Sequence, residues 1–136
     1  MTGAKPEAIL VVDDDDLYVR AITRHLRQSG YMFVFRACSS EQALAMRERV
    51  RPAVVLTDMV MEQRDSGVHV IAAALRYGMG CAVISGLPGL DAAVLGVPVL
   101  RKSTVDGLKV GELVRSLIGE AQRRGSASLR PKEEVA

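Results

Sequence analysis

Three carboxylates, a hydroxyl and an ammonium stand at the ends of short apolar runs in this sequence. The residues are Asp13, Asp14, Asp58, Ser85 and Lys102. Clustered carboxylates repel one another and raise each other's proton affinity, so a hard divalent cation such as Mg²⁺ favours their arrangement. A carboxylate beside the metal can attack a phosphoryl group, while a lysine and a hydroxyl contact the phosphoryl oxygens. These residue types predict a magnesium-dependent phosphoacceptor site.

Each of these residues also has a plainer explanation when taken alone. The Asp13–Asp14 pair can simply cap a helix, and Asp58 can be a solvated loop residue. Ser85 can be a turn residue and Lys102 a surface charge. Their positions after the first, third, fourth and fifth apolar runs favour a shared site, because the carboxyl ends of parallel strands meet at one edge of a sheet.

The elements that must position these residues follow from alternating patterns. Apolar runs predict five strands, at residues 8–12, 31–37, 53–57, 81–84 and 97–100. Segments with helical periodicity lie between the strands or after the last one. The first begins at Asp15 or Asp16 and stops at Gly30, and the others cover residues 39–50, 68–77 and 105–124. Residues 90–95 leave room for little more than one turn. The alternation predicts a doubly wound α/β domain with a five-stranded parallel sheet, in which the fourth helix is short or absent.

Several residues are assigned structural roles by the same patterns. Leu17 in the first helix and Leu108 in the last fall on apolar stripes that are expected to face the sheet. Cys38 and Cys81 lack metal-ligand spacing, and we expect two buried thiols in a reducing compartment.

Composition narrows the domain organisation and the class of partner. The chain has 136 residues and a net charge of +2, which fits one domain and gives no sign of a nucleic-acid or membrane partner. Residues 81–100 form the longest apolar stretch, but glycines and prolines interrupt it, so we expect no membrane helix. With no signal-peptide core near the start, we expect a cytoplasmic protein. The domain is predicted over residues 7–122, followed by a flexible tail at 125–136.

Four segments of the sequence resemble the receiver domain of bacterial response regulators, over about residues 7–122. They are Ile-Leu-Val-Val-Asp-Asp-Asp at 9–15, Val-Leu-Thr-Asp-Met-Val-Met at 55–61, Val-Ile-Ser-Gly at 83–86 and Val-Leu-Arg-Lys at 99–102. The resemblance implies the flavodoxin-like receiver fold. It also implies a two-component signalling protein that takes a phosphoryl group from a sensor histidine kinase, and not a conventional enzyme.

The resemblance assigns a role to each site residue. Asp58 would be the phosphoacceptor and a Mg²⁺ ligand. Asp14 would bind Mg²⁺ directly, Asp13 directly or through water, and the backbone carbonyl of Val60 would complete the protein's share. Ser85 and Lys102 would contact the phosphoryl group.

Several residues depart from the family pattern. Glu62 stands where proline is frequent, and Gly67 comes one residue late, so the loop after Asp58 is expected to be longer and more acidic. Ser103 replaces a proline that often forms a cis peptide, which is costly without proline. Val99 replaces an aromatic residue that usually changes rotamer on phosphorylation. We therefore expect ordinary phosphoacceptance and unusual output, and a homodimer would need a non-standard surface.

Other functions remain open at this point. Asp13-x-Asp15 superficially fits a haloacid-dehalogenase-like phosphatase, in which Asp13 would be the nucleophile. A receiver-like module that is never phosphorylated is a further alternative. His25 and His69 lie in predicted helices without partner patterns and are interpreted as structural. The chain is expected to be a stand-alone regulator without an output domain, or else a receiver excised from a hybrid kinase.

Overall fold

The protein forms one parallel sheet covered by helices on both faces. The computed structural model describes residues 5–61 and 66–135, with side chains to residue 123. Along the chain the elements are β1 (Lys5–Val12), α1 (Asp16–Gln28), β2 (Tyr31–Ala37), α2 (Ser40–Val50), β3 (Val54–Thr57), α3 (Val68–Tyr77), β4 (Gly80–Ser85), α4 (Ala92–Leu95), β5 (Val99–Arg101), the 3₁₀ turn η1 (Lys102–Thr104) and α5 (Gly107–Val135). The sheet order is β2-β1-β3-β4-β5, and all neighbouring strands are parallel. This confirms the predicted fold.

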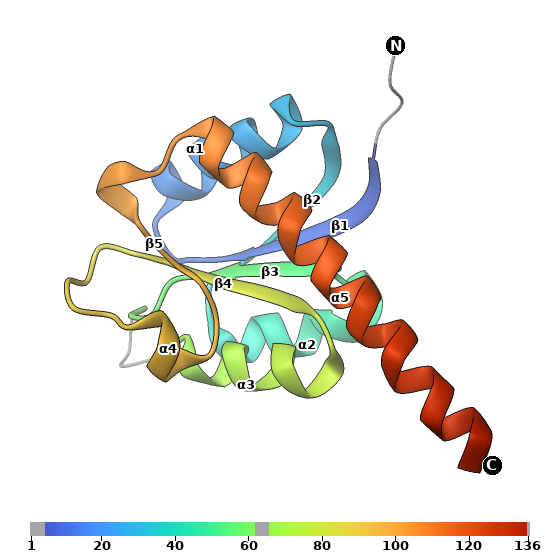
Figure 1. Cartoon of the computed structure of the whole chain (residues 1–136). Coiled ribbons are helices and arrows are strands. Elements are labelled where there is room, and N and C mark those ends of the chain that lie inside the picture. Colours follow the sequence, from blue (N-terminus) through green and yellow to red (C-terminus); the bar gives the residue numbers. More distant parts are fainter. Residues whose placement is uncertain (1–4, 62–65, 136) are drawn as a thin grey trace.

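Strand β1 lies inside the sheet and contributes to the core on both faces. Ile9 and Val11 pack with α1 and α5, whereas Leu10 and Val12 pack with residues of α2 and α3. In Figure 1, α1 and α5 cover one face, and α2 and α3 cover the other. Because both faces are covered, the strand is apolar at every position of this run, which is why periodicity identified it as buried.

Side-chain caps define where α1 and α2 begin. The carboxylate of Asp15 accepts hydrogen bonds from the backbone N–H groups of Leu17 (3.1 Å) and Tyr18 (3.2 Å). The Ser39 hydroxyl accepts from the Gln42 N–H (3.1 Å), and the Gln42 side chain accepts from the Cys38 N–H (2.6 Å). These caps satisfy N–H groups that a helix start leaves unpaired, as their spacing predicted.

Two leucines and one cysteine are not buried, and their predicted burial is wrong. Leu17 is 76% exposed and Leu108 is 72% exposed. Each precedes a buried leucine of its helix, Leu26 or Leu117, by nine residues, which is about two and a half turns and therefore the opposite face. Cys38 is exposed because it lies in the connection between β2 and the cap of α2.

Cys81 fits its predicted burial. It lies in β4 and packs with residues of α3. Burial raises the pKa of its thiol to about 12. Cys81 is therefore a structural thiol that stays protonated at neutral pH.

The segment between β4 and α5 is the least regular part of the fold. Helix α4 spans only Ala92–Leu95 and buries none of its residues, which confirms the predicted shortening. Strand β5 is Val99–Arg101, shifted from the predicted residues 97–100. Helix α5 continues to Val135 and extends past the sheet in Figure 1, whereas the sequence predicted its end near Arg124. The predicted domain bounds of 7–122 and the flexibility of 125–136 stay predictions.

Within the described residues, no helix combines the length and the apolar composition that crossing a bilayer requires.

Candidate functional site

Asp13 and Asp58 are placed side by side by the backbone of the sheet. The Asp13 N–H donates to the Ala37 carbonyl (3.0 Å), which continues the β1–β2 pairing one residue past β1. The Asp58 N–H donates to the Val12 carbonyl (2.9 Å) and continues the β3–β1 pairing in the same way. The two aspartates therefore stand on adjacent strands at the carboxyl edge, as predicted.

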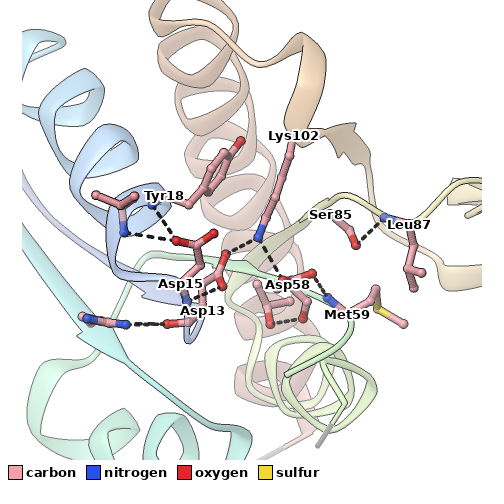
Figure 2. Close-up of polar contacts among 11 residues, drawn as sticks. Asp13, Asp15, Tyr18, Asp58, Met59, Ser85, Leu87 and Lys102 are labelled. Atoms are coloured by element: carbon pink, nitrogen blue, oxygen red, sulfur yellow. Dashed lines mark hydrogen bonds and ion pairs between the residues drawn. The ribbon is translucent and has the colours of Figure 1, made fainter. Parts of the chain in front are cut away.

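The side chains at this edge form one cluster around Lys102 (Figure 2). Asp13, Asp14 and Asp58 each offer a carboxylate oxygen, and these oxygens lie within 4.8 Å of one another. The Lys102 ammonium lies 2.8 Å from Oδ2 of Asp13 and 3.0 Å from Oδ2 of Asp58. Asp13 is 3% exposed and Asp58 is 8% exposed, so these ion pairs are largely shielded from water. Four of the predicted site residues are thus brought together.

Burial and charge shape the electrostatics of this cluster. Burial raises the pKa of the Asp13 carboxyl, although the hydrogen bond from Lys102 works in the opposite direction. Burial alone lowers the pKa of the Lys102 ammonium, but the hydrogen bonds to Asp13 and Asp58 outweigh this effect, and the pKa is raised. Lys102 is therefore charged at neutral pH. One ammonium cannot balance three carboxylates, so the cluster favours a further cation.

Hydrogen bonds to the backbone orient the two buried carboxylates. Oδ1 of Asp13 accepts from the Asp15 N–H (3.0 Å), and Oδ1 of Asp58 accepts from the Met59 N–H (2.7 Å). In both residues the other oxygen, Oδ2, contacts Lys102. The Thr57 hydroxyl donates to the Asp58 carbonyl (2.8 Å). Side chain and main chain of Asp58 are both fixed before any reaction.

Gly67 approaches the phosphoacceptor candidate more closely than any other residue type could. A Cβ atom added to Gly67 would lie 2.1 Å from the Asp58 carbonyl oxygen, far inside van der Waals contact. The Gly67 N–H donates to the Met59 carbonyl (2.9 Å) and closes the loop after Asp58. The sequence indicated only that this glycine was displaced by one residue. Its packing role required the structure.

Ser85 and Val60 lie at the same carboxyl edge, and the contacts of each are with other groups. Ser85 is buried at the end of β4, pairs in register with Arg101, and its hydroxyl oxygen accepts from the Leu87 N–H (3.2 Å). Val60 is exposed and pairs with Ser66 across the loop. The phosphoryl-binding role of Ser85 and the metal-binding role of the Val60 carbonyl stay predictions. Glu62, expected to make this loop more acidic, lies outside the described residues.

The family model described as the response regulator receiver domain matches residues 9–85, which is more than half of the chain and includes Asp13, Asp14, Asp58 and Ser85. The chain belongs to this family. As a receiver domain it is a phosphoacceptor signalling module and not a conventional enzyme, and a histidine kinase is the partner that this class implies. Membership also decides against the haloacid-dehalogenase-like alternative.

Relatives and solved structures agree with this assignment. The transcriptional regulatory protein PrrA of Mycobacterium leprae is 30% identical over 138 residues, and the match covers 99% of this chain and 58% of PrrA. A receiver domain from Clostridium thermocellum is 26% identical, with a TM-score of 0.73 over 85% of this chain and 97% of its own. A CheY-like receiver protein from Methanospirillum hungatei shares the fold at 22% identity and a TM-score of 0.75, covering 88% and 99% of the two chains.

Two site residues of this receiver were not found from the sequence. Arg36 of β2 donates from Nε (3.3 Å) and Nη2 (3.2 Å) to the Asp13 carbonyl, and its Nη1 forms an ion pair with Asp16. Tyr18 of α1 lies against Lys102, with the ammonium 4.6 Å from the ring centroid. Both act through neighbours far away in the sequence, so no local motif marks them.

The departures from the family pattern have structural counterparts in this receiver. No cis peptide occurs among the described residues, and Ser103 lies within the 3₁₀ turn that Lys102 opens. Val99 is partly buried against a core cluster that includes residues of α3 and β4. His69 is exposed and His25 packs against Gly107; neither belongs to the carboxylate cluster.

Proposed function

We propose that this receiver accepts a phosphoryl group on Asp58 from the phosphohistidine of a sensor histidine kinase. The observation that carries the proposal is the Lys102 ammonium bridging Oδ2 of Asp13 and Oδ2 of Asp58, at 2.8 and 3.0 Å, beside a third carboxylate. A carboxylate oxygen of Asp58 attacks phosphorus in line, the bond from phosphorus to the histidine nitrogen breaks, and the imidazole leaves. Water later hydrolyses the acyl phosphate and restores the carboxylate.

The donor set suits Mg²⁺, which prefers oxygen ligands and shares its shell with phosphate oxygens. Asp13, Asp14 and Asp58 would hold the ion, and the Val60 carbonyl would add a fourth protein oxygen. When bound, the metal supplies neutralisation of the charge on the transferring phosphoryl oxygens. Lys102 contacts the same oxygens as a point charge, and Ser85 donates its hydroxyl to them once it leaves the Leu87 N–H.

The wider setting of this receiver follows from its class. A cytoplasmic location is proposed because two-component phosphotransfer takes place there. The chain spans 58% of the length of the curated relatives it matches, which are transcriptional regulatory proteins. The expectation of a stand-alone regulator without an output domain, and of a homodimer through a non-standard surface, stays a prediction.

The test is phosphorylation by acetyl phosphate with and without Mg²⁺, read by intact mass and by mapping the modified peptide. The wild-type protein should be labelled on Asp58 only when Mg²⁺ is present, and Asp58→Asn should not be labelled. Asp15→Asn is the matched control, since Asp15 is exposed, and asparagine also caps helices. Label on Asp13, or on the Asp58→Asn variant, would contradict the proposal. No labelling by acetyl phosphate or by any histidine kinase would favour a module that is never phosphorylated.

A further inference from the structure

Tyr18 connects the hydrophobic core to the candidate site. Its backbone N–H donates to the Asp15 cap in the first turn of α1, and its ring packs with the core cluster under α1 and α5. The ring also lies alongside the Lys102 side chain in Figure 2, with the ammonium 4.6 Å from the ring centroid. Asp13, Asp58 and Tyr18 line the same small pocket. Lys102 is therefore held between two carboxylates and an aromatic face.

We propose that Tyr18 is a positioning residue for Lys102, holding the ammonium in place through its ring while the partners of Asp13 and Asp58 change. The inference rests on the proposed phosphoacceptor function. A cation within about 6 Å of an aromatic ring is attracted by the ring's negative face, and the attraction grows when water is excluded. Both conditions hold here, because the Lys102 side chain is only 21% exposed.

Of the three contacts of Lys102, the Tyr18 ring is the one that the proposed reaction leaves unchanged. Asp58 turns from a carboxylate into an acyl phosphate, so Lys102 must pass from the Asp58 oxygen to the phosphoryl oxygens. Asp13, which would also hold the metal, would share its oxygens between the metal and Lys102. Both ion pairs of Lys102 are therefore exchanged or shared during the reaction. The aromatic face is unchanged by either event. It can therefore keep the ammonium at the site while the ion pairs are exchanged.

The hydroxyl of Tyr18 is not the part that acts on Lys102. It lies at the end of the ring away from the carboxylates in Figure 2, is buried, and has no hydrogen-bond partner among the described residues. Burial raises the pKa of this phenol to about 12, so it is neutral at physiological pH. A phenylalanine would present the same ring face without an unpartnered hydroxyl. Tyr18→Phe is thus the conservative variant, and Tyr18→Leu removes the ring.

A direct readout is the reactivity of lysine amines toward limiting acetic anhydride, measured peptide by peptide on the full chain. Without the ring, the Lys102 amine is less shielded and less firmly held, so it should be acetylated roughly threefold to tenfold faster in Tyr18→Leu than in wild type. Tyr18→Phe should stay within about twofold of wild type. Lys109, which contacts the Thr104 carbonyl, serves as the internal reference. A ring that only fills the core would leave Lys102 reactivity unchanged in a folded Tyr18→Leu protein, which would overturn the proposal.

The second readout is the rate of Asp58 phosphorylation at saturating acetyl phosphate and Mg²⁺. We expect Tyr18→Leu to be roughly threefold to tenfold slower, with the affinity for Mg²⁺ unchanged and the rate rescued in Tyr18→Phe. Leu17→Ala, at an exposed neighbouring position, is the control. Equal slowing in Tyr18→Phe and Tyr18→Leu would assign the effect to the hydroxyl and overturn the proposal. Should Tyr18→Leu melt below the assay temperature, Tyr18→Met provides the same comparison.

The two readouts separate the inference from the function on which it rests. If the wild-type protein takes no phosphoryl group but Tyr18→Leu still raises Lys102 reactivity, phosphoacceptance is contradicted and the placement of Lys102 by Tyr18 is retained. Normal phosphorylation of Asp58 with unaltered Lys102 reactivity in Tyr18→Leu would contradict the inference alone.

Discussion

The two halves of the sheet's carboxyl edge differ in how tightly their residues are packed and hydrogen-bonded. Around β1 and β3, buried carboxylates are fixed by backbone N–H groups and by Lys102, and Gly67 touches the Asp58 main chain. Around β4 and β5, α4 is a single turn with no buried residue, and β5 has three residues that are partly buried or exposed. Val94 on α4 is 81% exposed.

This contrast separates the phosphoacceptor site from the surface that is expected to carry the output. Phosphoryl transfer depends on placing charges within a fraction of an ångström, so the first half tolerates little change. Three departures from the family pattern, at Val99, Ser103 and the short α4, fall in the second half, whereas the displaced Gly67 lies in the first. A receiver can therefore keep its phosphoacceptor geometry while its output surface is rebuilt.

The largest effect is expected at Gly67. Replacing Gly67 with alanine forces a methyl group against the Asp58 carbonyl and should lower the free energy of unfolding by about 3 kcal/mol. Gly86→Ala is the matched control in the other half, because a Cβ there meets nothing within 4 Å. Urea denaturation of both variants measures the difference. Equal stability of the two variants would contradict the difference in packing between the two halves of the edge.

Lys102 should give the next largest effect. Lys102→Ala leaves two buried carboxylates without their cation and should lower the free energy of unfolding by about 2 kcal/mol in EDTA. Adding Mg²⁺ should narrow this gap, because the metal neutralises the same oxygens. Arg101→Ala, one residue earlier and exposed, should change stability little under either condition. A gap that Mg²⁺ does not alter would argue against a metal among these carboxylates.

Arg36 tests how far the fixed half extends. Arg36→Met removes two hydrogen bonds to the Asp13 carbonyl and the ion pair with Asp16, and should cost about 1 kcal/mol of unfolding free energy. We also expect weaker Mg²⁺ binding by titration calorimetry, because the loop carrying Asp13 loses a support. Arg24→Met, at an exposed position of α1, is the control. If Arg36→Met binds Mg²⁺ as tightly as wild type, the tightly held half of the edge does not extend to β2.

The smallest effect is expected on α4. Val94→Lys should change the free energy of unfolding by less than about 0.5 kcal/mol, since the side chain is 81% exposed. Thermal melting is sufficient to measure it. A loss well above this amount would mean that α4 packs more tightly than its exposure indicates, and the two halves would then differ less than described.

The sequence revealed most of the scaffold and four members of the cluster, because both leave local traces. Runs that are apolar at every position mark buried parallel strands, and polar residues directly after such runs mark the edge where sites gather. Tyr18 and Arg36 left no such trace. Tyr18 reads as another apolar residue of α1, and Arg36 as a charge on an edge strand, until Lys102 and Asp13 are placed beside them.

The ends of two helices differ from the prediction. Leu17 and Leu108 seemed to extend apolar stripes, but the angular step of the helix puts them opposite Leu26 and Leu117. Glycine, serine and proline weaken a helix and predict the end of α5 near Arg124, whereas the helix continues through these residues to Val135.

The two cysteines make this receiver convenient to study with thiol chemistry. They are the only cysteines in the chain, and burial of Cys81 with a thiol pKa of about 12 leaves Cys38 as the reactive one. Cys38 directly follows Ala37, whose carbonyl pairs with the Asp13 N–H. A maleimide dye would therefore attach at Cys38, beside the site. The unaltered sequence could thus be labelled as a fluorescent sensor of its own phosphorylation state.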